Sequence, residues 1–401
     1  MRVLLAAFGT RGDIQPLVAL GLELRGRGHQ VTVCTPPDYT EWVQCFGLEA
    51  HAVGAPFDAF VKQSSNGLAG IRFAIQALPK MIAAQYDAMN ELAKQTDVML
   101  GAALTAAGAS FAEKYGLQYH YMSCAPCVLP SAAHPSLFTK GQTHAAWVNR
   151  LTWWVADQQN NFGLGPIING QRKKLGLKPV RDIWRHILTS RPIIASDPAL
   201  GELPSEAPEG TVQTGTWLLP SRERLSPEVT RFLDAGPPPV YVGFGSMPER
   251  APDRATARIF EAVKHAGVRA VISRGAAGLG NVELPNQIIM IGSEPHAVLF
   301  SRCVAVMHHG GAGTTAAAAR AGVPQLIEPK MTDQFYWRRR VQERGLMPEG
   351  TFGTPADLGA GLRVCIEDVG LRDRASAFAA QLGSDGVARG ADHLEAVFNT
   401  R

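Results

Sequence analysis

The sequence predicts an α/β fold made of two doubly wound domains that face each other across a cleft. Its 401 residues are about twice the usual size of one domain. Short apolar runs alternate with longer helical segments almost from end to end, which is the pattern of a parallel sheet covered by helices. A hydrophobic content of 46% against 18% charged residues is enough to fill two cores and excludes a disordered chain.

Two series of strands are expected, one in each domain. The first series comprises residues 2–9, 29–36, 97–104, 118–126 and 192–197. The second series comprises residues 238–246, 269–275, 287–293, 303–310 and 324–329. Prolines and charged residues between the two series mark a linker at 219–237. We therefore expect domains at 1–218 and 238–384, followed by a C-terminal helix at 385–401 that can pack back on the first domain.

A longer, irregular insertion is expected at 147–176, where three tryptophans and a phenylalanine occur. These aromatic residues are interpreted first as part of the core. If the insertion borders a cleft, it is also a place where an apolar ligand can bind.

Charge and cysteine patterns exclude several classes of protein. The formal net charge is +4 with both signs mixed along the chain, which argues against a nucleic-acid-binding stripe. The six cysteines are scattered, and the pair Cys124 and Cys127 lacks a second pair for zinc, so we expect structural thiols and a cytoplasmic location. No apolar run is long enough to span a membrane, and the first one is interpreted as a strand rather than a signal peptide.

The stretch HHGGAGTTAAAARAG, residues 308–322, predicts a strand, a glycine turn and a helix. The first N–H groups of a helix have no partner inside it, and they stand at the positive end of the helix dipole. Together they form a binding site for a diphosphate that needs no metal. The candidate residues are Gly311, Ala312, Gly313, Thr314 and Thr315.

Two alternatives remain open for this turn. It can be a tight connection without a ligand, or it can bind a dinucleotide, since it matches G-x-G-x-x-A and Glu328 follows at the end of the next strand. The pair His308-His309 favours a diphosphate leaving group, because a dinucleotide turn needs no histidine. Asp333 and Gln334, at the start of the next helix, suit the paired hydroxyls of a sugar, although Asp333 alone can be a helix cap.

The segment FGTRGDIQP leaves the first strand at its carboxyl end and carries Asp13. A carboxylate there lies at the mouth of the cleft and can act as a general base. Alternatively, Asp13 caps a helix that begins near Pro16.

Three stretches together resemble a known family: residues 9–36, 241–248 and 292–345. They are similar to nucleotide-sugar-dependent glycosyltransferases of the GT-B fold, with two Rossmann-like domains. Within this class, the sequence resembles bacterial sterol glucosyltransferase-like enzymes and the enzymes that glycosylate glycopeptide antibiotics. The resemblance covers both domains, and it is loose at residues 55–200, where the acceptor is expected to bind.

The resemblance implies a role for each matching residue. Asp13 takes the position of the catalytic base, in a loop with Thr10 and Gly12. Ser246 matches a serine that contacts the donor phosphate, and His309 matches the histidine on the diphosphate. The other implied donor-binding residues are Ser293, Glu294 and His296 beside the nucleoside, Gly311, Ala312, Gly313, Thr314 and Thr315 under the diphosphate, and Asp333 and Gln334 at the sugar. Ala317 stands where plant relatives have a ribose-binding glutamate, which leaves UDP and TDP both open.

The implied activity is an inverting transfer of a hexose, with glucose favoured, from a UDP- or TDP-sugar to a hydroxyl of an apolar acceptor such as a sterol or polyphenol. The chain contains no D-x-D sequence, so neither a metal nor a cofactor is expected. The expected partners are the donor and the acceptor, with no nucleic acid and with transient contact to a membrane surface if the acceptor is a lipid. A nucleotide-sugar epimerase, a NAD-dependent oxidoreductase and a non-catalytic sugar-nucleotide sensor are the alternatives.

Overall fold

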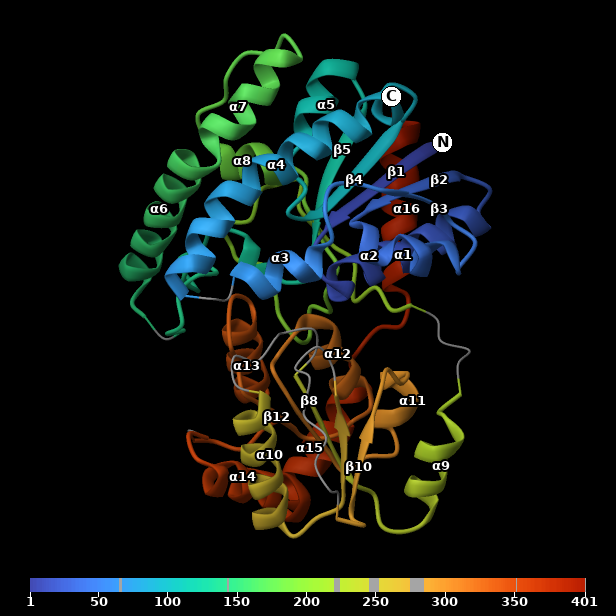
Figure 1. Ribbon diagram of the computed structural model, residues 1–401, viewed down its shortest axis with the longest axis vertical. Coiled ribbons are helices and arrows are strands. Elements are labelled where there is room, and N and C mark those ends of the chain that lie inside the picture. Colours follow the sequence, from blue (N-terminus) through green and yellow to red (C-terminus); the bar gives the residue numbers. More distant parts are fainter. Residues whose placement is uncertain are drawn as a thin grey trace. The chain divides into compact units, whose positions relative to one another are not determined.

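The computed structural model describes residues 1–64, 67–142, 144–219, 224–244, 252–274, 285–350 and 352–400 (Figure 1). The chain divides into two compact units. The first consists of Met1–Pro198, Glu202–Leu219 and Gly383–Arg401, and the second consists of Ala199–Gly201 and Pro220–Leu382.

The first unit is built on a seven-stranded parallel sheet of order β3-β2-β1-β4-β5-β6-β7. Its strands are β1 (Arg2–Phe8), β2 (Gln30–Thr35), β3 (Glu49–Ala52), β4 (Val98–Ala103), β5 (Gln118–Ser123), β6 (Ile193–Ile194) and β7 (Val212–Gln213). In the centre, the last residue of β1, Phe8, stands opposite Ala103 at the end of β4. The carboxyl ends of these two strands therefore meet at one edge of the sheet.

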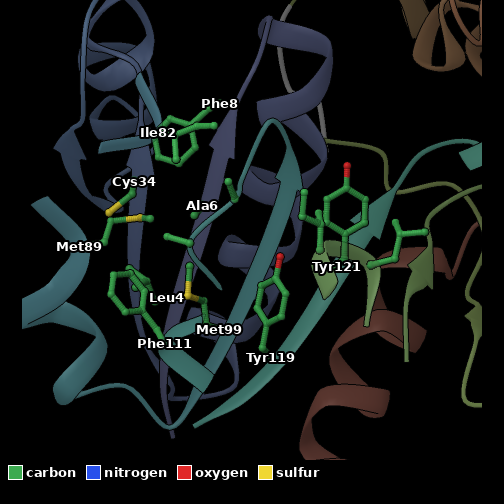
Figure 2. Close-up of a cluster of buried hydrophobic side chains, with 14 of the residues drawn as sticks. Leu4, Ala6, Phe8, Cys34, Ile82, Met89, Met99, Phe111, Tyr119 and Tyr121 are labelled. Carbon is green, nitrogen blue, oxygen red and sulfur yellow. The ribbon is translucent and has the colours of Figure 1, made fainter. Parts of the chain in front are cut away.

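Helices cover both faces of this sheet. They are α1 (Arg11–Gly26), α2 (Pro37–Gln44), α3 (Phe57–Ser64), α4 (Gly67–Lys94), α5 (Gly108–Tyr115), α6 (Ala146–Gly163), α7 (Gly165–Lys174), α8 (Ile183–Leu188) and α16 (Gly386–Asn399). Because strand side chains alternate between faces, Leu4 and Ala6 enter one core and Val3 and Leu5 enter the other. Figure 2 shows the first core, where Met89 and Phe111 approach the sheet from α4 and α5.

The second unit has a five-stranded parallel sheet of order β10-β9-β8-β11-β12. Its strands are β8 (Val240–Gly243), β9 (Ala270–Ser273), β10 (Ile288–Ile291), β11 (Ala305–His308) and β12 (Gln325–Ile327). Its helices are α9 (Pro227–Asp234), α10 (Pro252–Ala266), α11 (His296–Phe300), α12 (Ala312–Arg320), α13 (Gln334–Glu343), α14 (Pro355–Glu367) and α15 (Val369–Ala379). Buried clusters lie on both faces here as well. The predicted class of parallel, helix-covered sheets is confirmed.

Four local differences from the sequence-based expectations have physical causes. The insertion at 147–176 is regular, because its apolar residues repeat at helical spacing and form α6 and α7. Residues 227–234, inside the expected linker, form α9 behind the capping hydroxyl of Ser226. The short strands β3 and β7 were not expected from the sequence. They lie at the two edges of the sheet, where a strand needs fewer apolar residues.

The fourth difference concerns the first helix, which begins at Arg11 rather than near Pro16. Asp13 is consequently the third residue of α1 and not a residue before it. Pro16 has no N–H to donate to the Gly12 carbonyl one turn earlier in the helix. Gly12 is exposed, so water can take the place of this hydrogen bond. Helix α16 packs against α1 within the first unit, where Arg27 forms ion pairs with Asp392 and Glu395.

Candidate functional site

Asp13 is held at the carboxyl edge of the first sheet by the N-terminus of α1. The backbone N–H of Thr10 donates to Asp13 Oδ2 at 2.8 Å, and the Thr10 hydroxyl lies 3.1 Å from the same oxygen. Both donors belong to Thr10, the N-cap of α1, so the carboxylate is fixed by the first turn of its own helix. Its second oxygen, Oδ1, makes neither of these contacts.

Gly9 gives the Asp13 carboxylate its space. A Cβ at position 9 would overlap the carboxylate, with Oδ2 as the nearest atom. Gly9 does not have a positive φ, so its role here is steric rather than conformational. The sequence analysis did not single out Gly9. A glycine directly after a strand and four residues before an acidic residue is the only sequence signal that points to it.

The environment of Asp13 changes the pKa of its carboxyl group. Burial raises the pKa above the usual value for aspartate, and the two hydrogen bonds from Thr10 oppose this rise. Burial raises the pKa of Tyr121 as well, and the charge of the Asp13 carboxylate adds to this rise. A half-buried carboxylate with a raised pKa is a stronger proton acceptor than an exposed one.

An apolar pocket opens beside this edge of the same unit. Its lining residues are Leu78, Met81, Ile82, Gln85, Ala103, Leu104, Thr105, Ala106, Leu164, Trp184 and Ile187. They come from α4, from the end of β4 and the loop that follows it, from α8 and from the residue between α6 and α7. The pocket has few polar groups and a volume of about 50 Å³, so it suits an apolar group at the end of a ligand rather than a whole drug-sized molecule.

Two hydrogen bonds to backbone carbonyls fix the pocket residues Ala103 and Leu104 at the Asp13 edge. Tyr121 donates its hydroxyl to the carbonyl of Ala103 at 2.9 Å, and the N–H of Leu104 donates to the carbonyl of Phe8 at 3.1 Å. The buried Gln85 side chain holds the loop from the other side, through Leu104 and Ala106. Ala103 has φ of 52°, a strained conformation for alanine that these contacts maintain. None of these pocket residues was predicted, because they meet only through the sheet register.

In the second unit, the glycine turn follows β11 as predicted and α12 begins at Ala312. Gly310 has φ of 92°, which only glycine adopts without strain, and Gly311 is the N-cap. The first helical N–H groups, those of Ala312, Gly313 and Thr314, precede the first helical bond, which runs from Thr315 N–H to the Gly311 carbonyl. This is the geometry of an anion-binding helix N-terminus.

The Thr315 side chain is directed into the protein. Its hydroxyl donates to the Gly311 carbonyl at 3.0 Å and the residue is fully buried. Both donors of Thr315 are therefore used within the turn. Thr314, by contrast, remains partly exposed at the same helix end.

The two adjacent histidines differ in environment. His308 is fully buried, its Nδ1 accepts the Gly310 N–H at 3.0 Å, and its Nε2 lies 2.9 Å from Gln325 Oε1. His309 is partly exposed, and its ring lies over Gly311, where a Cβ would come within 2.6 Å of Nε2. Burial lowers the pKa of His309 to about 4, against the opposing effect of the Gly243 backbone. His309 is thus neutral at pH 7 and carries a single ring N–H.

Gln334 and Asp333 lie beside the glycine turn, and their side chains are partly engaged. Gln334 Oε1 accepts the backbone N–H groups of Lys330 at 2.7 Å and Met331 at 3.0 Å, which leaves its amide NH₂ to donate. Asp333 is the N-cap of α13 by position, yet its Oδ1 accepts from the Thr332 hydroxyl at 3.0 Å rather than from a helix N–H.

The predicted nucleoside segment has internal contacts of its own. Glu294 Oε2 accepts the N–H of Ser226 at 3.1 Å. The His296 ring stacks on Phe300 with centroids 4.5 Å apart, and its Nε2 lies 3.3 Å from the Tyr241 hydroxyl. Ser293 is exposed just before them. Ser246 lies outside the described residues.

Glu328 is part of an ion-pair cluster. Its Oε1 lies 2.5 Å from Arg258 and 3.1 Å from Lys330. One oxygen of Glu328 is thus occupied by two cations, whereas the other, Oε2, is buried and accepts no hydrogen bond from the part of the chain that the structure describes. Among the described residues, no group of three or more His, Cys, Asp or Glu side chains is arranged to hold a metal ion. No described helix has the length and apolar character to cross a membrane.

Comparison with known proteins gives matches in both units. Residues 3–133 match the glycosyltransferase family 28 N-terminal domain, and residues 261–389 match the C-terminal domain of erythromycin biosynthesis protein CIII-like proteins. Over 397 residues the chain is 38% identical to vancomycin aglycone glucosyltransferase of Amycolatopsis orientalis, covering 97% of this chain and 95% of that protein.

A second relative and a solved structure are also glycosyltransferases. A sterol 3-beta-glucosyltransferase of Arabidopsis thaliana is 30% identical over 372 residues, which is 87% of this chain and 57% of the plant protein. The crystal structure of the glycosyltransferase VinC in complex with dTDP has the same fold, with a TM-score of 0.71, 22% identity and full coverage of both chains. These matches support neither the epimerase nor the oxidoreductase alternative.

Proposed function

This chain belongs to the nucleotide-sugar-dependent glycosyltransferases of the GT-B fold, and we propose that it transfers a hexose, with glucose favoured, to a hydroxyl of an apolar natural product or sterol. One observation carries the acceptor side of this proposal. The Asp13 carboxylate and an apolar pocket lie at the carboxyl edge of one sheet, where the N–H of Leu104 in the pocket lining donates to the carbonyl of Phe8 at the end of β1. A base beside an apolar pocket suits the deprotonation of a hydroxyl on a bulky, apolar molecule.

In the proposed reaction, Asp13 takes the proton of the acceptor hydroxyl as its oxygen attacks the anomeric carbon. The bond from that carbon to the diphosphate breaks, and the nucleoside diphosphate leaves with the bonding electrons. A single displacement without a protein nucleophile inverts the anomeric centre, so an α-linked donor gives a β-glycoside. General-base catalysis of this kind contributes about 10² to 10⁴ in rate.

The glycine turn supports the donor side of the proposal. The N–H groups of Ala312, Gly313 and Thr314, with the N–H of His309, would stabilise the charge that develops on the leaving diphosphate. The free amide NH₂ of Gln334 and the Asp333 carboxylate would bind the sugar hydroxyls. Because these groups already supply the stabilisation, we propose that the reaction needs no metal. We propose either TDP or UDP as the nucleotide of the donor. The VinC complex with dTDP supports the first, and the sequence does not exclude the second.

The reaction is proposed to take place in the cytoplasm. None of the six cysteines, all of which lie in the described residues, forms a disulfide, and four of them are buried, as expected for a protein folded under reducing conditions.

The test begins with calorimetry of UDP-glucose, TDP-glucose, GDP-mannose and NAD on the wild type and on His309→Ala, without added metal. Binding of one nucleotide sugar that His309→Ala weakens identifies the donor. Transfer is then measured with a panel of apolar alcohols and phenols, and NMR of the product gives the anomeric configuration. Binding of NAD alone, or transfer that survives Asp13→Asn unchanged, contradicts the proposal.

A further inference from the structure

Helix α6 presents an apolar stripe to solvent. Five of its large apolar side chains are exposed: Trp147 (68%), Leu151 (48%), Trp154 (60%), Val155 (40%) and Phe162 (88%). Their spacing of four, seven, eight and fifteen residues from Trp147 places all of them on one face of the helix. We call these five residues the α6 stripe. A contiguous apolar surface of this kind marks a place where another molecule binds.

The opposite face of α6 is well anchored, so the stripe is not the result of a loosely placed helix. Asn149, Trp153 and Ala156 are buried. The Asn149 amide donates to the Ala132 carbonyl at 2.8 Å, and the Trp153 indole donates to the His134 carbonyl at 3.1 Å. The fold therefore holds the stripe outward.

The stretch of chain that carries the stripe is strongly basic, and two of its arginines have acidic partners from outside it, Arg150 with Glu206 at 3.9 Å and the buried Arg172 with Glu113 at 2.7 Å. Residues 134–191 contain nine Lys and Arg and only two Asp, a formal net charge of +7 in a chain whose total is +4. The exposed basic residues are Lys140, Arg150, Lys173, Lys174, Lys178, Arg181, Arg185 and Arg191. Helices α7 and α8, which carry several of them, pack against α6, and Figure 1 shows the three helices grouped in green. This charge disfavours a second copy of the same face and favours an anionic surface.

The stripe also leads to the apolar pocket. Helix α6 ends at Gly163, and the next residue, Leu164, lines the pocket together with Trp184. An apolar acceptor dissolved in a lipid surface under α6 would thus meet the pocket at the end of the same helix.

We propose that the α6 stripe docks on an anionic lipid surface, with Trp147 and Trp154 entering the interface and the basic residues facing the headgroups. Tryptophan on one face and Lys and Arg around it are the features of helices that lie in a membrane interface without spanning it. The delivery of an acceptor to the pocket rests on the proposed function, whereas the lipid contact itself does not.

Sedimentation of the full chain with vesicles tests this contact. The vesicles contain phosphatidylcholine alone or phosphatidylcholine with phosphatidylglycerol. We expect stronger binding to the anionic vesicles, weakened by salt, and a partition coefficient at least about tenfold lower for Trp147→Gln/Trp154→Gln. Lys173→Glu/Lys174→Glu should lower binding to anionic vesicles alone. The matched control is Val369→Gln, an exposed apolar position (58%) on α15 that should bind as the wild type does.

Several outcomes separate this inference from the proposed function. Absence of vesicle binding by the wild type, or equal binding by the double tryptophan variant, overturns the docking surface. A wild-type dimer that the same variant converts to monomer, measured by light scattering, also overturns it, because a second copy then covers the stripe. Retained transfer to a water-soluble acceptor in the variant, with lipid binding lost, supports it. Vesicle binding by a chain that transfers no sugar leaves the docking surface standing and rejects the proposed function.

Discussion

His308 Nδ1 accepts the backbone N–H of Gly310 at 3.0 Å, two residues further along the chain. This contact requires an unprotonated Nδ1, so the ring proton is on Nε2 and is donated to Gln325. Gln325 in turn donates to the carbonyl of Thr315, inside α12. The buried histidine therefore ties the strand, the turn and the helix together, while its neighbour His309 is partly exposed beside the turn.

We predict that His308→Leu destabilises the protein and weakens donor binding. Leucine leaves the Gly310 N–H and the Gln325 amide oxygen unpaired in the interior, at about 1–3 kcal/mol for each group. His308→Asn keeps an acceptor near Nδ1 and should cost less. Urea unfolding measures the stability, and calorimetry measures donor affinity in the folded protein. Equal donor affinity in both variants and the wild type would show that the turn does not depend on His308.

Asp13→Asn is predicted to lower the transfer rate by about 10² to 10⁴ while leaving donor affinity nearly unchanged. Asparagine can still accept both hydrogen bonds from Thr10, but it cannot take a proton. Steady-state kinetics and calorimetry separate the two effects. Loss of donor affinity to the same extent as activity would indicate a binding role instead.

The same carboxyl group has a predictable effect on pH dependence. Its pKa in the folded protein is raised by burial, so kcat/KM should fall as the pH drops through a value above that of ordinary aspartate. Because the folded state favours the protonated form, Asp13 opposes folding at neutral pH and this effect disappears at low pH. Asp13→Asn should therefore raise Tm at pH 7, measured by calorimetry. A lower Tm would contradict the assigned pKa direction.

Gly9→Ala is predicted to reduce kcat by about tenfold to a hundredfold with an intact fold. The new methyl group overlaps the Asp13 carboxylate, which must then move away from Thr10, and a shift of about 1 Å costs on this scale. Gly26→Ala, at the end of the same helix, has no atom within 4 Å of its new Cβ and serves as the control. Similar kinetics for the two variants would refute the steric role of Gly9.

Leu78→Trp is predicted to fill part of the apolar pocket and to raise KM for bulky apolar acceptors by about tenfold, as expected for a crowded site. Hydrolysis of the donor in the absence of acceptor should not change. Ile75→Trp places the same side chain on the same helix at an exposed position outside the pocket and is the control. Unchanged KM in Leu78→Trp would place the acceptor elsewhere.

Much of the fold and part of the site could be predicted from the sequence. The ten strands of the two expected series can be recognised in the sequence because buried parallel strands are apolar runs. The turn at residues 308–313 can be recognised by its glycines. The prediction of an irregular insertion at 147–176 was wrong, because the helical spacing of its aromatic residues was not taken into account. The start of α1 was misplaced because Pro16 suggested a first turn, whereas Thr10 and Asp13 form it.

By itself, the sequence determined the strands, the glycine turn and the positions of Asp13 and His309, because each depends on residues that are close along the chain. Only the tertiary structure decided which polar groups near the turn are already engaged in hydrogen bonds or ion pairs within the protein. The hydroxyl of Thr315 and the amide oxygen of Gln334 are used internally, and Glu328 is paired with Arg258 across 70 positions. The pocket exists because the sheet register brings Ala103 to the end of β1. Hydrogen bonds and ion pairs between distant residues depend on that register, which no local pattern contains.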